Sequence, residues 1–384
     1  MKKSLLALAA MGAFAGAAQA QSSVTVYGLI DHSFTSISTE STTRAGAVSN
    51  ATATNSGNNG RMSGSRLGFR GVEDLGGGNS AGFTLEMGPD FTEASNGINN
   101  GTRLGFLSLS NKQAGGLHIG RQVSATKLVN DTFTAFGNAS FVTGNVAGAG
   151  LSTATVLQTT GAYTVTNNAA TQGTIGNANG GERISNLIRY TTPALIPGLS
   201  AQAAFYKNAT SNSATAAGII GDTNGEGTDF GVRYTAGAFD AMAAYTNYAT
   251  TNGTGFDFSV KNTIMSLGAS YDAKMVKGFV AYNKRDYDVT ATNTLIKFTD
   301  VTVGLNAPLG NTNLLVAYSS GTDDSSVQKT DKSGFQVGAV YNLSKRTNIY
   351  AVYGSGKADS VALGTSTNRK VDETGTAIGV RHTF

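Results

Sequence analysis

The amino-acid sequence predicts an all-β fold, a transmembrane antiparallel β-barrel of 16 strands. Its 384 residues include 50 glycines but only 4 prolines, and Thr, Asn and Ser are abundant, which favours short strands and turns over helices. Short connections with turn chemistry alternate with longer polar segments along the chain. The last ten residues place Ile378, Val380 and Phe384 on one face and Arg381 on the other, the period of a strand between lipid and water. Taken alone, that alternation also fits a strand in a soluble sandwich.

The N-terminus is typical of an export signal. Lys2 and Lys3 precede a short apolar stretch that ends in Ala18-Gln19-Ala20, the pattern of a cleaved secretory signal peptide over residues 1–20. Residues 21–384 then form the mature protein, which we expect to be a single barrel domain. No later apolar run approaches the ~18 residues of a membrane helix. Cysteine is absent, so an exported chain of this kind depends on its size and not on disulfides for stability.

The strands are predicted in order from the positions of the turns. An even number of strands is what bacterial outer-membrane barrels require. The sixteen predicted ranges are 23–37, 61–74, 80–91, 103–111, 117–122, 183–192, 199–210, 228–236, 239–250, 258–271, 277–288, 295–307, 312–321, 334–342, 347–355 and 374–384. Tyrosines that recur near strand ends are candidates for the aromatic belts at the two membrane interfaces. They are Tyr27, Tyr190, Tyr206, Tyr234, Tyr271, Tyr318, Tyr341 and Tyr350.

Several sequence blocks occur in an order that resembles the general porins of β-proteobacteria. They are SVTVYGLID (23–31), SRLGFRGVEDLG (65–76), GRQ (120–122), RISNLIRYTTP (183–193), YNLSKRT (341–347) and GVRHTF (379–384). Each block alone is weak evidence, but the ordered set spans almost the whole mature chain. It is similar to the Gram-negative porin family with Neisseria, Burkholderia and Comamonas-like members.

The resemblance implies a passive, water-filled channel for small hydrophilic solutes and inorganic ions in the cell outer membrane. It also implies a long third loop folded into the lumen, a homotrimer, contact with outer-membrane lipid and lipopolysaccharide, and recognition by the barrel-assembly machinery through the C-terminal strand that ends at Phe384. No cofactor is implied. A barrel of sixteen strands is too wide for its own side chains to fill, so selectivity depends on charge and width at the narrowest point.

Arginines on the predicted inner wall are the candidate selectivity residues. In strand 61–74, Leu67 and Phe69 alternate with Arg66 and Arg70, so both arginines are expected to face the lumen, because a cation on the lipid face costs about 2 to 4 kcal/mol at the midplane. In strand 183–192 the same reasoning pairs Arg183 with Arg189 against Ile184, Ile188 and Tyr190.

The family resemblance narrows the constriction to fewer positions. By alignment of the blocks, Arg66, Arg103 and Arg183 match a basic cluster on the wall, and Arg121 is a possible fourth member. Around Arg103 the alternation breaks, since Leu104 and Phe106 oppose Leu107 and Leu109, which indicates a bulge or a mistaken strand start. These arginines can also be read as solvating the inner wall or holding loops by salt bridges.

The third loop departs from the family pattern. From residue 132 to 181 there is no charged residue, so Asp131 and Glu182 are the only acids near it, whereas family members usually place loop carboxylates opposite the basic wall. Its second half, 146–181, is rich in Gly, Ala, Thr and Asn, and part of it is expected to lie outside the channel. With few opposing carboxylates, we expect the pore to prefer anions.

Other functions were weighed against a general channel. A substrate-specific outer-membrane channel and a secreted soluble β-sandwich adhesin remain alternatives. An enzyme is disfavoured because none of the three histidines, His32, His118 and His382, lies in a nucleophile motif. Without cysteines or paired histidines no metal site is expected. The formal net charge of +4, half of it from Lys2 and Lys3, gives no support to nucleic-acid binding.

Overall fold

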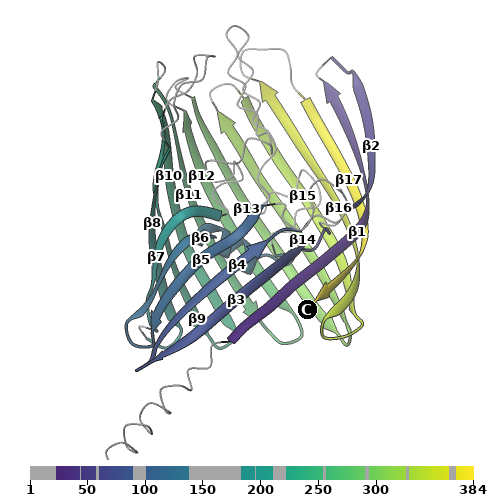
Figure 1. Cartoon of the computed structure of the whole chain (residues 1–384). Coiled ribbons are helices and arrows are strands. Elements are labelled where there is room, and N and C mark those ends of the chain that lie inside the picture. The colour runs from purple at the N-terminus through teal and green to yellow at the C-terminus, as the bar shows by residue number, and fades with distance from the viewer. Residues whose placement is uncertain are drawn as a thin grey trace, which may run out of the picture.

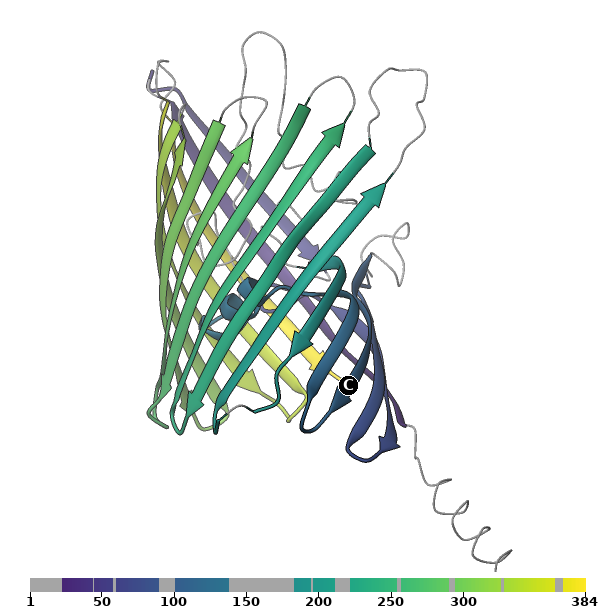
Figure 2. The same cartoon turned by 90° about the vertical axis from the view of Figure 1, so that its left-hand side faces the viewer.

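The strands of the computed structural model wind into one closed barrel (Figures 1 and 2). The structure describes residues 23–43, 45–57, 60–89, 101–137, 183–194, 196–210, 222–253, 257–289, 294–325, 328–362 and 369–384. The predicted signal peptide, the boundary after residue 20, Glu182 and the loop segment 138–181 lie outside these ranges. The described strands form the barrel, and residues 124–137 are the described start of the third loop.

Every strand runs antiparallel to its neighbours. The strands are β1 (Ser23–Thr43), β2 (Val48–Gly57), β3 (Arg66–Gly76), β4 (Asn79–Met87), β5 (Thr102–Asn111), β6 (Gly115–Val123), β7 (Arg183–Thr191), β8 (Leu199–Thr210), β9 (Asp222–Ala236), β10 (Phe239–Gly253), β11 (Asp257–Asp272), β12 (Lys277–Val289), β13 (Thr294–Leu309), β14 (Thr312–Ser325), β15 (Gln328–Asn342), β16 (Thr347–Ala362) and β17 (Arg369–Thr383). β2 and β3 both pair with β1, each strand from β3 onward pairs with the next in sequence, and β17 closes the sheet on β1.

Seventeen described strands occupy sixteen positions around the barrel, as predicted. The upper part of β1 pairs with β2, from Ser33 to Thr42, and its lower part pairs with β3, from Ser23 to Leu29. β2 and β3 therefore share one position, with residues 58–65 between them. The prediction that residues 38–60 form a loop was wrong. β2 is polar on both faces because it extends above the lipid, so it carries no apolar alternation from which to predict a strand.

The closing strand matches the prediction. β17 pairs with β1 from Leu29 opposite Thr383 to Thr43 opposite Arg369. The Gly28 N–H donates to the Phe384 carbonyl and the Phe384 N–H donates to the Gly28 carbonyl, both at 3.1 Å. Ile378 is 69% exposed on the outer face, whereas Ala377 is buried on the inner face. The terminal strand therefore seals the barrel with its apolar face outward.

Parity separates a lipid face from a lumen face along the described strands. Of the tyrosines proposed for the belts, five are exposed on the outer face: Tyr190, Tyr234, Tyr271, Tyr318 and Tyr341. The assignment was wrong for the remaining three. Tyr206 and Tyr350 are buried on the lumen side, and the Tyr27 hydroxyl donates to Glu86 on the inner wall. These three rings therefore lie on the inner side of the wall and not in a membrane-interface belt.

The wall is low over one sector. β3 to β7 hold 9 to 11 residues each, whereas β9 to β17 hold 13 to 16. Figure 2 shows these short strands beside the taller strands, with a helix inside the barrel at the height of their upper ends. The low sector carries the arginines singled out above.

Candidate functional site

A helix of the third loop lies inside the barrel against the tall wall. α2 (Ala125–Thr132) begins directly after β6 and packs on β9, β10 and β11. Ser124 caps its N-terminus, since its Oγ accepts from the Lys127 N–H at 3.1 Å. The loop turns inward here, and Ala125, Val129 and Phe133 pack against Met242 and Ala244 of the wall.

A buried carboxylate anchors the start of this helix. Asp229 on β9 is fully buried, and its two oxygens accept from the Ala125 N–H at 2.9 and 3.1 Å. Thr246 Oγ1 donates to it at 2.7 Å, and Arg189 Nη2 pairs with it at 3.2 Å. Arg189 therefore faces inward as predicted, but the helix covers it and its guanidinium also donates to the Val123 carbonyl. Arg189 therefore holds the start of the third loop against the wall and is not part of the water-exposed surface of the channel.

Glycines on alternate strands make room for the loop along the wall. A Cβ added to Gly231, Gly268, Gly304 or Gly338 would meet a third-loop side chain, at distances of 3.1, 2.4, 2.8 and 3.0 Å respectively. The loop residues met are Ala125, Phe133, Ala135 and Phe136, in chain order. β9, β11, β13 and β15 thus supply one glycine each where the loop passes. We call these four positions the glycine track.

Polar contacts hold the far end of the helix. The side-chain amides of Asn130 and Asn283 bond to each other in both directions, at 2.9 and 3.1 Å. Asn283 also donates to Asp300 at 2.8 Å and accepts from Ser266 Oγ at 2.6 Å. Because these partners are buried, leaving one of them unsatisfied would carry a desolvation cost. The helix is therefore fixed at both ends, which fixes the direction of its exposed side chains.

The low wall presents a row of arginines to the lumen. Arg66 on β3 shares a face with Tyr27 and Glu86 and interacts electrostatically with Arg103, Glu86 and Asp131. Arg103 lies at a register shift between β4 and β5, as its broken alternation indicated, and its Nε pairs with Glu86 Oε1 at 2.7 Å. The structure therefore brings Arg66, Arg103 and Asp131 together.

Arg121 lies at the edge of this row, on the face of the wall that carries the exposed Leu107 and Ile119 and not on the face of Arg66. Its Nε donates to the Thr102 carbonyl at 2.9 Å, one residue from Arg103, and its Nη1 donates to Ser185 Oγ at 2.8 Å and to the Arg183 carbonyl at 3.3 Å. In the β5–β6 ladder it lies opposite Gly105, on the side of Leu107 and Ile119. Its guanidinium ties the ends of β5 and β7 together.

The predicted alternation around Arg183 was wrong. Ile184 is buried with Leu187 and lies opposite Gln122, while Arg183 lies opposite Val123 on the other side of the ladder. Asn186 adopts a positive φ of 56°, and the register between β6 and β7 shifts between Gly120 and Gln122. This irregularity reverses the parity between Arg183 and Arg189. Its sequence signal is weak, since Asn tolerates positive φ but does not require it.

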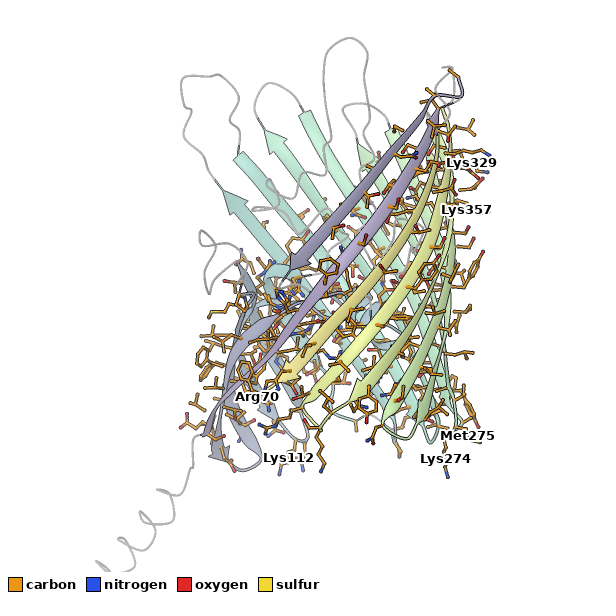
Figure 3. The ribbon with its side chains drawn as sticks, turned by 90° about the vertical axis from the view of Figure 1, so that its right-hand side faces the viewer. Arg70, Lys112, Lys274, Met275, Lys329 and Lys357 are labelled. Carbon is orange, nitrogen blue, oxygen red and sulfur yellow. The ribbon has the colours of Figure 1, made fainter. Side chains whose placement is uncertain are left out.

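The helix presents one ion pair toward the pore. Lys127 Nζ and Asp131 Oδ1 are 3.0 Å apart and four residues apart in sequence, so they lie on one helix face. Arg70, the other residue expected to face the lumen, lies below Arg66 with its guanidinium over the Tyr27 ring, 5.6 Å from the centroid. Figure 3 shows Arg70 toward the end of the barrel that carries the short turns.

Glu86 was missed from the sequence. It is the acidic partner of the low wall, and period-2 reading of β4 was sufficient to find it, because Phe83 and Leu85 alternate with Thr84 and Glu86. Among the described residues, no helix is long and apolar enough to cross a membrane. No group of three or more metal-ligating side chains gathers within the same ranges.

Comparison with known proteins agrees with this geometry. A family model described as Gram-negative porin matches residues 7–360. The chain belongs to this porin family. Outer membrane porin protein 32 of Delftia acidovorans is 31% identical over 409 residues, and an outer membrane porin protein of Bordetella pertussis is 28% identical over 421 residues; each match covers the full length of both chains.

Solved porin structures share the fold. An anion-selective porin from Comamonas acidovorans superposes with a TM-score of 0.67 at 24% identity, covering 95% of this chain and 100% of its own. The trimer form of OmpT from Vibrio cholerae gives 0.61 at 13% identity, covering 94% and 99%. This porin is thus a channel of the Gram-negative outer membrane and not an enzyme.

Proposed function

We propose that this porin is a general diffusion channel for small hydrophilic solutes and ions, and that it prefers anions. The observation that carries the proposal is the charge that the described residues place around the lumen. Arg66, Arg103 and Lys127 face the carboxylates of Glu86 and Asp131, and each carboxylate already has a cationic partner. A surplus of positive charge at the narrow part of a pore attracts anions and repels cations. The description of the Comamonas structure as anion-selective supports the same sign.

The low wall supports the proposal of a homotrimer. β4 and β6 have 9 residues, the lower limit for a strand that spans a bilayer. Their sector exposes apolar side chains, namely Leu85, Leu107, Leu109 and Ile119. We propose that a second copy of the chain covers this apolar face where the short strands leave the wall low. Two further contacts stay predictions: one with lipopolysaccharide, and one with the barrel-assembly machinery through the strand that ends at Phe384.

Planar-bilayer recording tests both points. In a KCl gradient the reversal potential of the purified porin should have the sign of anion preference, and Arg66→Gln should shift it toward cations. Lys112→Gln, in the exposed turn before β6 (Figure 3), is the matched control and should leave it unchanged. A cation-selective sign for the native protein contradicts the anion proposal. Three equal closing steps per insertion support the trimer, and single steps contradict it.

A further inference from the structure

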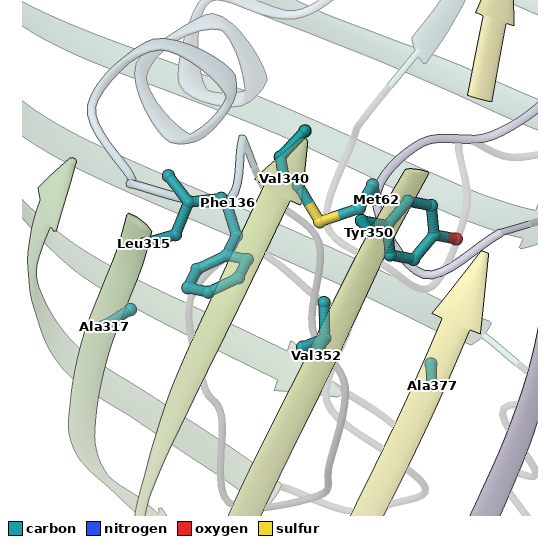
Figure 4. Packing of buried hydrophobic residues seen from close by; sticks show 8 residues of the cluster. All are labelled: Met62, Phe136, Leu315, Ala317, Val340, Tyr350, Val352 and Ala377. Atoms are coloured by element: carbon teal, nitrogen blue, oxygen red, sulfur yellow. The ribbon is translucent and has the colours of Figure 1, made fainter. Parts of the chain in front are cut away.

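Residues 60–65, between β2 and β3, leave the wall and enter the lumen. Met62 is buried in a cluster with Val340, Val352 and Ala377, which lie on the inner faces of β15, β16 and β17. Phe136 of the third loop belongs to the same cluster (Figure 4). The third loop thus reaches this part of the wall from one side, and residues 60–65 reach it from the other.

A buried carboxylate holds this segment in place. Asp31 on β1 is fully buried; it accepts from the Ser63 N–H at 2.7 Å and from the Tyr350 hydroxyl at 2.7 Å. Its main chain accepts from the Gly60 N–H at 2.9 Å and from the Ser65 hydroxyl at 3.3 Å. A Cβ on Gly60 would lie 1.6 Å from the Asp31 carboxylate, so the approach requires glycine. The side chain and carbonyl of Asp31 thus form a binding site on the inner wall for residues 60–65, which we call the seat.

The seat positions a cation in the lumen. The Arg61 N–H donates to the Tyr350 hydroxyl at 3.0 Å, which orients the residue along the inner wall. Its half-buried side chain interacts electrostatically with Glu373, which lies on the lumen face of β17. Further along β17, Arg381 donates to Ser63 Oγ at 3.4 Å. Arg61 thereby extends the arginines of the low wall toward the β16–β17 side.

We propose that residues 60–65 are a second constriction element, seated by Asp31, and that Arg61 is a selectivity residue for permeating anions. The segment narrows the lumen from the wall opposite α2, so solutes pass between two infolded pieces of chain. The role of Arg61 rests on the proposed anion preference. The narrowing does not, because it follows from the position of the segment.

Neutral-sugar swelling of proteoliposomes tests the narrowing alone. Asp31→Ala leaves the Ser63 N–H and the Tyr350 hydroxyl without their acceptor, and Tyr350→Phe removes one hydroxyl while keeping the packed ring. Both should admit larger sugars faster than the native porin, and the milder Tyr350→Phe keeps the test valid if Asp31→Ala does not fold. Heat-modifiable mobility on gels reports folding. Native swelling rates in folded Tyr350→Phe and Asp31→Ala porins would overturn the constriction.

Reversal potentials test Arg61. Arg61→Gln should lower the anion-to-cation permeability ratio by roughly fourfold, because one unit charge about 10 Å from the permeating ion in water favours an anion by about twofold and disfavours a cation by about twofold. Lys112→Gln should leave the ratio unchanged. A native porin that prefers cations contradicts the proposed function, whereas an unchanged ratio in Arg61→Gln contradicts the role of Arg61. Whichever ion the porin prefers, the sugar-swelling experiment tests whether residues 60–65 narrow the lumen.

Discussion

The glycine track predicts that a single methyl group inside the barrel narrows the pore. Gly268 lies on the lumen face of β11, opposite Ala281 of β12. In Gly268→Ala, the new Cβ would lie 2.4, 2.6 and 2.7 Å from three carbons of Phe133. Carbon atoms in contact prefer separations of about 3.5 to 4.0 Å, so the ring must retreat by about 1 Å or more.

The retreat has one direction open to it. Phe133 is fully buried between the wall and the loop, so it moves away from β11, which is toward the channel axis. Overpacking of this kind costs about 1 to 3 kcal/mol in folding free energy. We therefore expect Gly268→Ala to lower single-channel conductance and to lower the thermal unfolding midpoint of the barrel.

Gly278→Ala is the matched control. Gly278 lies on the outer face of the neighbouring strand β12, and the nearest heavy atom to its added Cβ is Leu305 Cδ2 at 3.8 Å, an ordinary contact. The two variants share the same change in strand propensity and differ in what the methyl group meets. Planar-bilayer conductance and a thermal melt in detergent compare them. Equal conductance and equal midpoints for the two variants would refute the reasoning.

Three further variants test the anchor of the third loop, the charge of the pore wall and the closure of the barrel. Asp229→Ala removes the carboxylate that pairs with the buried Arg189, so we expect the free energy of unfolding to fall by about 3 to 5 kcal/mol in denaturant titrations. The third loop should also be cleaved faster by proteases. An unchanged titration midpoint would argue against Asp229 as the anchor of the loop. Glu86→Gln removes a wall carboxylate and should shift the reversal potential further toward anion preference, whereas a shift toward cations contradicts the assigned pore charge. Phe384→Ala removes the ring that lies over Gly28, so refolding yield in detergent should fall; native yields would show that the backbone pairing closes the barrel unaided.

The lipid-facing half of the fold was predictable from sequence. Lipid imposes an apolar side chain at every second residue, so period-2 alternation located the strands inside the membrane, including the closing strand with Ile378 and Val380 outward. Where strands leave the lipid that constraint disappears. β2 and the upper part of β1 are polar on both faces, and they were therefore missed as strands.

The lumen was only partly predictable. Parity placed Arg66 correctly on the inner wall, but one residue in a left-handed conformation, Asn186, reversed the parity beyond it. The seat of the third loop depends on pairs far apart in sequence, such as Ala125 and Asp229, 104 residues apart. Such pairs can be predicted only when the register of the intervening strands is known, because no local sequence pattern indicates them.

The shared position of β2 and β3 has a practical consequence for engineering. The β1–β2 ladder begins at Ser33 and the β1–β3 ladder ends at Leu29, so the chain that joins the two ladders can change in length without shifting either ladder or the β1–β17 seam. Because residues 60–65 are held on the inner wall, a peptide joined to them would start from the lumen side of the barrel, provided that the contacts of Gly60, Met62 and Ser63 are kept. This junction is therefore a natural graft point for a sensing or filtering peptide, with ionic current as the signal.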